Sequence, residues 1–359
     1  MRDREIVLFL GAGASKLCGL PTVEHFFEKV QVPRDRGFMT LYEGLARRIA
    51  IEEGSEKGIK WPIYDAEKIF GKLEQWVSTA GIAGEPAIAK LARGNLNLQI
   101  PAADLLAHLK REIVRIYGHA YLTVAQAHYR ELFSLLVRKK ISPAPIWIFT
   151  TNYDTVVEEL LGDVIFLNQI PAFEVGKLDL RTGFAVGTPG RWHPEIFFAE
   201  PRRGFCPVNL IKLHGSTTWK WDGEGEGRQP FHTGLPTPTG EYDCLVYFGY
   251  KSIPEIDPFK TLHQLLKDTL LRDVLVLSIG FRFGDPYIRE TFDFALRAND
   301  ALQLICSLTS APPPGSPLHE LMKPCPGKVS ILVGEDGAPL PFGRKEFCEQ
   351  LEKKFESAH

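Results

Sequence analysis

Four short groups of polar residues and glycines, each placed after a short apolar run, carry the chemistry available to this sequence. Gly-Ala-Gly-Ala-Ser occupies residues 11–15, Thr-Asn-Tyr-Asp 151–154, Leu-His-Gly-Ser 213–216 and Leu-Ser-Ile-Gly-Phe 277–281. Such apolar runs are typical of buried strands, and open α/β sheets bind ligands at the carboxyl ends of their strands. A glycine turn, an Asn/Asp pair and a histidine at such ends can together hold a dinucleotide and act on it.

The first group predicts a tight turn from a strand into a helix. Gly11 and Gly13 would let the backbone approach a phosphate closely, and the first amides of the helix and the Ser15 hydroxyl would donate to it. The common dinucleotide fingerprint needs a further glycine at position 16, where this chain has Lys16. A turn that binds no ligand is therefore an open alternative for this group alone.

Each of the other three groups also has a purely structural explanation. Asn152 or Asp154 would serve as a helix N-cap, and a single histidine such as His214 is often structural. Ser278 and Gly280 would suit an ordinary strand end. Their joint occurrence at four strand ends favours a ligand site, because packing alone explains the full set poorly.

Composition indicates a globular protein with no bias towards nucleic acid. The 359 residues allow about two domains, and 44% apolar with 24% charged residues is ordinary for a folded domain. The 42 basic and 44 acidic residues give a net charge of −2, so the basic excess of many nucleic-acid binders is absent. We therefore expect no direct binding of nucleic acid.

The cysteines and the apolar runs predict neither a metal site nor a membrane segment. None of the six cysteines forms a Cys-x-x-Cys pair, so we expect free thiols and no metal. The apolar run before Gly11 is too short for a signal peptide, and no run approaches the roughly 18 apolar residues of a membrane helix. We expect a cytoplasmic protein that does not enter a membrane.

The order of the apolar runs predicts an α/β fold with a Rossmann-like parallel sheet, helices on both of its faces and a large helical insertion. Residues 1–40 and 141–359 would form the Rossmann-like domain. Residues 41–140 would form the insertion, because Leu105, Leu109 and Ile113 recur at helical spacing and strand-like runs are nearly absent. Its loops are expected at residues 54–58, 81–86 and 94–101, where glycine and proline gather. Asp285 and Pro286 predict the start of a later helix.

Taken in order, the four groups resemble the sirtuin family. Sirtuins carry a Gly-Ala-Gly-x-Ser turn, a Thr-Gln-Asn-x-Asp segment, a His-Gly pair and a Gly-Thr-Ser-like strand end. Thr-Thr-Asn-Tyr-Asp at residues 150–154 and Gly-Phe-Arg-Phe-Gly-Asp at 280–285 look closer to the sirtuin-like NADases of bacterial antiviral defence. The resemblance covers residues 5–30, 146–160, 208–250 and 274–297.

Two departures separate the chain from the deacylating sirtuins. Those enzymes hold a structural zinc with two Cys-x-x-Cys pairs between the His-Gly motif and a later Phe-Gly pair. Here the Phe-Gly counterpart is Phe248-Gly249, and the interval after His214 contains only Cys244. The Gly-Ile-Pro-Asp-Phe-Arg-like stretch of sirtuins is represented by Gly-Leu-Pro-Thr at residues 19–22, without Asp-Phe-Arg. The resemblance thus implies NAD binding, while the departures argue against deacylation.

The resemblance also implies roles for individual residues. Asn152 would orient water and a ribose hydroxyl, Asp154 would contact the carboxamide and favour a cationic sugar, and His214 would act as a general base. The pyrophosphate would lie against the turn after the first strand, and the ribose or phosphate on the adenine side against the last strand end. The expected NAD-binding residues are Gly11, Ala12, Gly13, Ser15, Thr151, Ser278, Gly280 and Phe281.

The resulting hypothesis is an NAD hydrolase that releases nicotinamide and ADP-ribose, with NAD as substrate. Uncontrolled hydrolysis would kill the host cell, so the activity is expected to be held off until triggered, as an NAD-depleting effector of abortive infection. The resemblance implies a homo-oligomer, a partner such as a HerA-like ATPase or an Argonaute-like protein, or both, with the insertion as assembly surface. The alternatives are an NAD-dependent protein deacylase and a non-enzymatic sensor of NAD or ADP-ribose.

Overall fold

The computed structural model describes most of the 359-residue chain. The described residues are 4–31, 66–83, 88–93, 96–139, 145–162, 178–185, 190–201, 203, 205–223, 227–236, 242–247 and 255–357.

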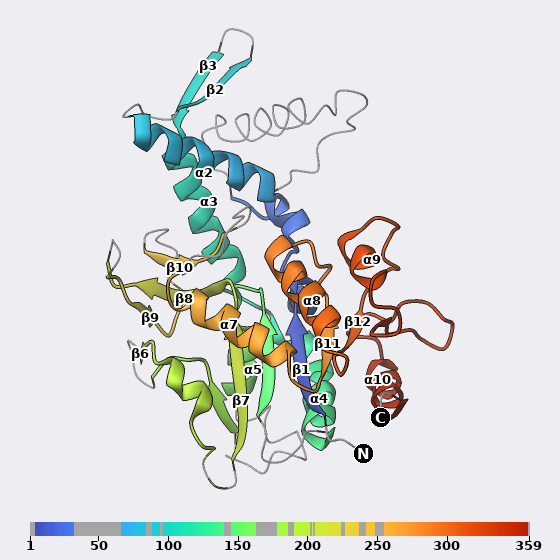
Figure 1. Ribbon diagram of the computed structural model, residues 1–359. Helices are drawn as coiled ribbons and strands as arrows, with labels where there is room; N and C mark the ends of the chain where they lie inside the picture. The colour runs from blue at the N-terminus through green and yellow to red at the C-terminus, as the bar shows by residue number, and fades with distance from the viewer. Residues whose placement is uncertain are drawn as a thin grey trace.

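A sheet of seven parallel strands forms the centre of the molecule (Figure 1). Each strand pairs in parallel with its neighbours, so all of their carboxyl ends lie at one edge. The predicted Rossmann-like α/β fold is confirmed. Across the sheet the strands are β13 (Val329–Ile331), β12 (Gln303–Ser307), β11 (Val274–Ile279), β1 (Glu5–Leu10), β4 (Ile146–Thr150), β7 (Cys206–Lys212) and β5 (Leu178–Arg181).

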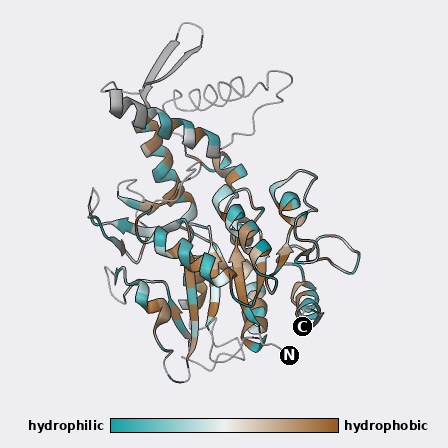
Figure 2. Cartoon of the chain, in the orientation of Figure 1, coloured by the Kyte–Doolittle hydropathy of each residue, from teal (hydrophilic) through white to brown (hydrophobic). Residues whose placement is uncertain are grey.

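Helices cover both faces of this sheet. Successive side chains of each strand point to opposite faces, and because these side chains are apolar, both faces must be shielded from water. In β1, Leu8 and Leu10 join one apolar core and Val7 and Phe9 join the other. Figure 2 shows apolar residues gathered on the central strands and hydrophilic residues on the outer sides of the covering helices. The first core includes α4 (Leu122–Lys139), α5 (Val156–Gly162) and α10 (Phe347–Ser357), and the second includes α7 (Phe259–Leu270), α8 (Pro286–Ala298) and α9 (Pro317–Met322).

The predicted insertion contains helices and also a hairpin that the sequence reading missed. Helix α2 (Ala66–Ala83) is followed by β2 (Ile88–Arg93) and β3 (Leu96–Pro101), which pair antiparallel. The loop predicted at residues 94–101 is thus wrong, because Leu-Asn-Leu-Gln-Ile at 96–100 alternates with the period of a strand. Residues 81–83 belong to α2, and the loop predicted at 54–58 lies outside the described residues.

Two helices of the predicted insertion share the main core. In α3 (Ala102–Tyr117), Leu105 and Leu109 belong to the same apolar cluster as Leu8 of β1. Helix α4 also reaches the turn after β1, where the Tyr129 hydroxyl donates to the Ala14 carbonyl over 3.2 Å. Division of the chain at residues 40 and 141 stays a prediction, but α3 and α4 pack as parts of the α/β core.

A small antiparallel sheet stands beside the parallel one. Its strands run in the order β10 (Asp243–Leu245), β8 (Gly215–Trp221), β9 (Pro230–His232) and β6 (Gly190–Arg191). Strand β8 begins just after β7, with Leu213 and His214 between them. Gly215 has a φ of 82°, and a Cβ there would lie 2.1 Å from the Cys244 carbonyl oxygen. Only glycine fits this tight corner, and the corner fixes the position of His214.

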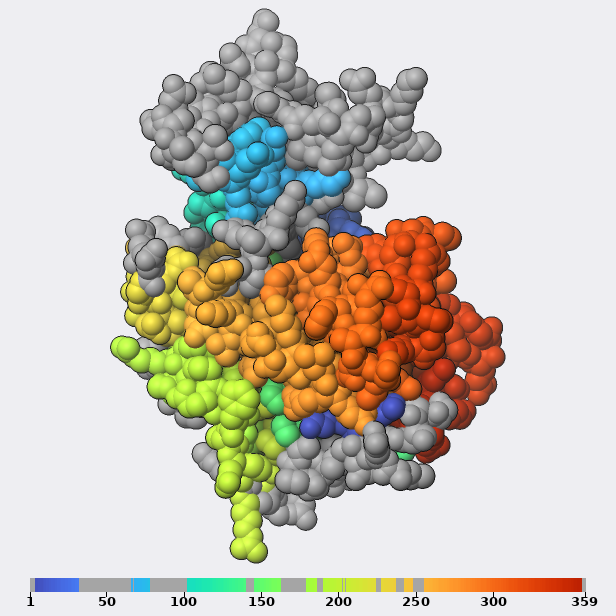
Figure 3. Space-filling model, viewed as in Figure 1, coloured from blue at the N-terminus to red at the C-terminus, as the bar shows by residue number. Residues whose placement is uncertain are grey.

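On the face seen in Figure 3, α7 and α8 lie in the centre and the residues after 300 lie at the right. Helix α2 lies above them, at the end of the molecule that carries the β2–β3 hairpin (Figure 1). No helix within the described ranges is long and apolar enough to cross a membrane.

Candidate active site

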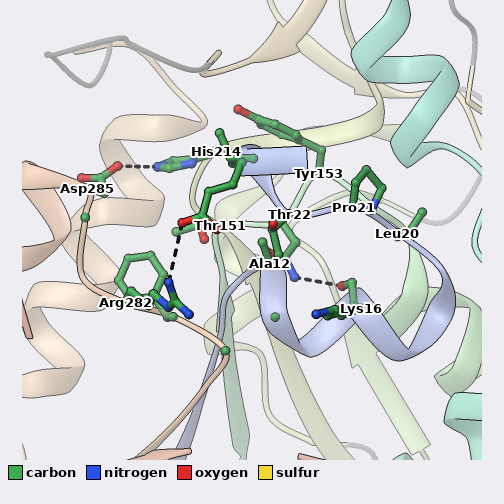
Figure 4. Close-up of a pocket in the computed structure, with 18 of the residues that line it drawn as sticks. Ala12, Lys16, Leu20, Pro21, Thr22, Thr151, Tyr153, His214, Arg282 and Asp285 are labelled. Atoms are coloured by element: carbon green, nitrogen blue, oxygen red, sulfur yellow. Dashed lines mark hydrogen bonds and ion pairs between the residues drawn. The ribbon is translucent and has the colours of Figure 1, made fainter. Parts of the chain in front are cut away.

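The strand order creates a topological switch point between β1 and β11. From β1 the chain moves to β4 on one side, and it later returns to β11 on the other side of β1. A cavity of about 1280 Å³ lies at the carboxyl ends of these strands, where such folds bind ligands. Its walls include the turn after β1, the loops after β4 and β7 and the segment after β11 (Figure 4). One face of α2 also lines it.

The glycine turn after β1 packs against the turn after β11, backbone to backbone. The Gly11 amide donates to Ile279 O over 2.9 Å, and the Gly13 amide donates to Gly280 O over 3.0 Å. A Cβ on Gly13 would lie 2.7 Å from the Gly280 Cα, and a Cβ on Gly280, whose φ is 65°, would lie 2.4 Å from the Ala14 nitrogen. These glycines are therefore required by contact between two parts of the chain.

This packing changes the predicted phosphate cradle. The amides of Gly11, Gly13 and Ala14 already donate to carbonyl oxygens of the protein, so their predicted role in binding pyrophosphate is not supported. The expected helix is the short 3-10 helix η1 (Ala12–Cys18), and its N-cap Gly11 does not line the cavity. Ala12, Gly13 and Ser15 do line it.

The turn after β4 is tied to the turn after β1 through Asn152 and Ser15. The Asn152 side-chain nitrogen donates to Gly11 O over 2.9 Å and to Ser15 Oγ over 3.0 Å. Both hydrogens of the amide are thus used within the protein, and the side-chain oxygen is the group left to accept a hydrogen bond. Asn152 lines the cavity as predicted, with a fixed orientation of its amide.

Asp154 holds this loop together and presents little surface to the cavity. The residue is 6% exposed, and its two carboxylate oxygens accept from the Ser15 hydroxyl at 2.7 Å and from the Val156 amide at 3.1 Å. Burial raises the pKa of Asp154, although the charge of Lys212 and the Ser15 hydrogen bond lower it. Asp154 also lines the cavity, and each of its oxygens keeps a free lone pair, so its predicted contact with a carboxamide stays a prediction.

His214 faces the cavity from the corner between β7 and β8. Its side chain is 14% exposed, and its Nε2 lies 3.1 Å from Asp285 Oδ2 (Figure 4). The contact falls short of an aligned hydrogen bond. The rings of Tyr153 and His263 are its neighbours, each with its centroid 6.5 Å from that of His214.

Asp285 is the residue that sequence reasoning missed at this site. It was predicted only as a helix start, and that prediction is confirmed, because its Oδ1 accepts from the Ile288 amide over 2.9 Å at the N-terminus of α8. Its other oxygen is the one that meets His214. The N-cap pattern accounts for the aspartate by itself, so no local sequence signal indicated a second contact.

The residues predicted at the end of β11 divide between the cavity and the core. Ser278 is fully buried and does not line the cavity, whereas its neighbour Ile279 does, because consecutive side chains of a strand point to opposite faces. The cavity therefore gives no support to the predicted contact of Ser278 with a ribose or phosphate. Gly280, Phe281 and Thr151 line the cavity.

Helix α2 contributes a polar stripe that the sequence reading did not assign to the site. Lys68, Gly71, Lys72 and Gln75 are spaced for one helix face, and all four line the cavity. Two further cations on its wall come from other elements, Lys16 from η1 and Arg282 from the segment after β11. This wall therefore suits an anionic part of a ligand.

Within the described ranges, no group of three or more His, Cys, Asp and Glu residues could hold a metal ion. Cys244 is a buried free thiol in β10. The Phe248-Gly249 pair of the predicted resemblance lies outside the described residues.

A comparison with protein families finds a match for the segment that contains Asn152 and His214. Residues 147–321 match the family model of the SIR2-like domain. This segment is therefore similar to SIR2-like domains. The predicted resemblance to sirtuins is confirmed for this range. The SIR2-like domain begins within β4 and ends within α9, so it also contains Asp285, whereas the turn after β1 and α2 precede it.

Several solved Sir2 structures also match the chain that carries this SIR2-like domain. A Sir2 homologue in complex with NAD has 13% identity and a TM-score of 0.43, covering 100% of this chain and 92% of that one. A mutant Sir2 homologue with 2′-O-acetyl-ADP-ribose has 14% identity and a TM-score of 0.43, covering 99% and 94%. A mutant with ADP-ribose has 12% identity and a TM-score of 0.39, covering 99% and 94%. No curated protein matches the chain.

Proposed function

We propose that this protein hydrolyses NAD at the bond between nicotinamide and ribose, releasing nicotinamide and ADP-ribose. The observation that carries the proposal is that Asn152 and His214, both within the SIR2-like domain, line one cavity at the switch point of the sheet. Sir2 structures in complex with NAD and with ADP-ribose are among the solved relatives of similar fold.

The cavity suits a dinucleotide in size and in charge. Its volume of about 1280 Å³ exceeds the roughly 300–1,000 Å³ of common ligand pockets, so it has room for a dinucleotide. Lys16, Arg282 and the lysines of α2 would attract the pyrophosphate, in place of the helix amides that the sequence first suggested. We propose that Ala12, Gly13, Thr151, Gly280 and Phe281 pack against the nucleotide on this wall.

The chemistry requires a leaving group, a stabilised cation and a water molecule. As the bond to ribose C1′ breaks, nicotinamide takes the electron pair and leaves as a neutral molecule, and the sugar develops oxocarbenium character. The side-chain oxygen of Asn152 would accept a hydrogen bond from the attacking water, because both hydrogens of its amide are held by Gly11 and Ser15. Its orientation is therefore set before the substrate arrives.

His214 would receive the proton. Water forms the new bond to C1′ and loses one hydrogen to the imidazole, which later releases it to solvent. The overall reaction converts NAD and water into nicotinamide, ADP-ribose and one proton. Asp154 supports this step indirectly, because it anchors Ser15 and thereby Asn152.

A protein deacylase is the main competing function. It would need an acylated lysine to enter the same cavity and attack C1′. The chain lacks the zinc cysteines and the Asp-Phe-Arg stretch of deacylating sirtuins, which favours water as the acceptor. A non-enzymatic sensor of NAD or ADP-ribose would bind without turnover, and it would not need the imidazole of His214 on the cavity wall.

We further propose that the activity is regulated and serves antiviral defence. Steady NAD hydrolysis would harm the cell that makes the protein, so an oligomer or a partner such as a HerA-like ATPase or an Argonaute-like protein would control it. Helix α2 belongs to the proposed insertion and also lines the cavity, so an assembly contact on the insertion would reach the site directly.

The test measures nicotinamide release from NAD by chromatography, for the protein alone and with candidate partners. Wild type is compared with Asn152→Ala and His214→Ala, with His193→Ala as control because His193 is half-exposed and lies outside the cavity. We expect turnover by wild type and the control, and a loss of about 100-fold or more in the two site variants.

The same assay separates the alternatives. Nicotinamide release that requires an acylated lysine peptide would make the protein a deacylase. Tight binding of NAD without release under every condition would support a sensor. Wild-type turnover no faster than that of His214→Ala would end the hydrolase proposal.

A further inference from the structure

We propose that Asp285 is a positioning residue that fixes the tautomer and orientation of His214 and stabilises its protonated form. This inference rests on the proposed hydrolysis of NAD, in which His214 is the base. The two residues come from distant parts of the chain, the corner after β7 and the start of α8, and their side chains point toward each other across the cavity wall (Figure 4).

The carboxylate of Asp285 is fixed in place by its own contacts, so it can orient the His214 ring. Its Oδ1 accepts from the Ile288 amide at 2.9 Å, and Pro286 fixes the first turn of α8. In the segment before it, Phe283 has a φ of 59°, rare for a bulky residue. The buried Phe283 ring packs against Phe281 and Phe292, with centroids 4.9 and 5.1 Å away, and these contacts keep the segment in place.

The surroundings of His214 make Asp285 its electrostatic partner. His263 of α7 packs on the ring, but burial first and then the charge of His214 lower the pKa of His263 to about 3, so it stays neutral. Tyr153 contacts the ring from the loop after β4. Lys267 lies over the ring of Tyr287, which in turn packs against His263. Among the described residues, Asp285 provides the carboxylate within 4 Å of the imidazole.

The charge state of Asp285 fits this role. Burial raises the pKa of Asp285, but the contact with His214, its charge and the Ile288 amide lower it, and the net shift is downward. The residue is therefore a carboxylate at neutral pH. A fixed carboxylate favours the neutral tautomer with a hydrogen on Nε2, which leaves the lone pair on Nδ1.

The step balances without a proton moving to the aspartate. Nδ1 takes one hydrogen from the water as its oxygen bonds to C1′ and the bond to nicotinamide breaks. The imidazolium then carries hydrogens on both nitrogens, and the one on Nε2 stays between the ring and Asp285 until Nδ1 returns its proton to solvent. Asp285 remains ionised throughout, as the orienting carboxylate of a catalytic triad does.

The N-cap role of Asp285 allows a clean test. Asparagine and serine cap helices about as well as aspartate, so Asp285→Asn and Asp285→Ser remove the charge and keep the cap. We expect kcat for NAD hydrolysis to fall by about 10- to 100-fold, KM to change by less than about 3-fold, and the midpoint of the acidic limb of the pH profile to move down. The double variant with His214→Ala should be no slower than His214→Ala by itself, because Asp285 acts through the ring.

A second readout does not require activity. The tautomer of the His214 ring is read by NMR from its ring-nitrogen shifts in wild type and in Asp285→Asn, with the signal assigned by its loss in His214→Gln. A wild-type ring that carries its hydrogen on Nε2, and loses this preference in Asp285→Asn, supports the pairing even if no NAD is consumed, in which case the proposed function fails and the pairing stands. An unchanged tautomer and unchanged kcat, with the thermal midpoint retained, would overturn the inference.

Discussion

The Ser15 hydroxyl donates to Asp154 Oδ2 over 2.7 Å and joins the turn after β1 to the turn after β4. The same oxygen of Ser15 accepts from the Asn152 amide. Ser15 therefore sets the orientation of a proposed catalytic side chain from a neighbouring strand. The buried carboxylate of Asp154 supplies the anchor on which that orientation depends.

Replacement of Ser15 by alanine should impair catalysis and stability together. The change removes one acceptor from Asn152 and leaves a buried carboxylate oxygen without its donor, which costs about 1–3 kcal/mol. We expect kcat to fall by roughly 10-fold and the urea midpoint of unfolding to drop. Ser330→Ala in β13 is the matched control, since Ser330 lies outside the cavity. A Ser15→Ala protein with normal kcat and normal stability would contradict this role.

The lysines of α2 should control affinity for the substrate. Charge reversal in Lys68→Glu or Lys72→Glu would weaken attraction of the pyrophosphate by about 1–2 kcal/mol, so KM for NAD should rise about 10-fold while kcat changes little. The effect should shrink at high salt, because exposed charges are screened. Lys260→Glu on the exposed side of α7 is the control. Equal KM values in initial-rate assays of all three variants would exclude α2 from the binding site.

Two glycines four positions apart in the chain should differ sharply in their tolerance of a side chain. Gly280→Ala places a Cβ 2.4 Å from a backbone nitrogen at a φ of 65°, whereas a Cβ on Gly284 meets nothing within 4 Å. We expect Gly280→Ala to lower the free energy of unfolding by about 2 kcal/mol or more and Gly284→Ala to leave it nearly unchanged. Chemical denaturation followed by circular dichroism measures both, and similar midpoints would contradict the packing described for the two turns.

Stability should fall as the pH drops below about 6.5, in part because of His263. Burial lowers the pKa of His263 from 6.5 to about 3, so between these values the unfolded chain binds one proton more than the folded protein. This residue's contribution is complete above pH 6.5 and is lost by up to about 1.4 kcal/mol per pH unit on acidification. His263→Gln should flatten the dependence of the unfolding free energy on pH between 6.5 and 4, relative to wild type and to His193→Gln. An unchanged slope in His263→Gln would mean that the residue is not buried as a neutral ring.

The strand ends were predictable from sequence because each follows an apolar run that is buried on both faces. Val7 and Leu8 of β1 show why, since they enter opposite cores. The hairpin β2–β3 was missed because helical spacing on both sides of it masked a short alternating segment. Asn152 and His214 line one cavity, because strand order brings their loops together, and their roles there stay predictions.

Other parts of the site depended on contacts that no local pattern specifies. The position of Ser278 turned on which face of β11 it occupies, and one residue along the strand reverses that face. The second contact of Asp285 is with His214, which follows another strand. The N-cap role was a sufficient explanation for Asp285 in the sequence, so this contact was not predicted. The amides of Gly11 and Gly13 suggested a phosphate site, but their acceptors come from the end of β11.

The interlocked turns after β1 and β11 bear on how distant relatives of this chain should be interpreted. Gly11, Gly13 and Gly280 would be retained by any chain that keeps these two turns in contact, whether or not it still turns over a substrate. The glycine motif is thus a marker of architecture. A relative that has lost catalysis would be recognised instead by change at Asn152, His214 or Asp285, while its glycines stayed in place.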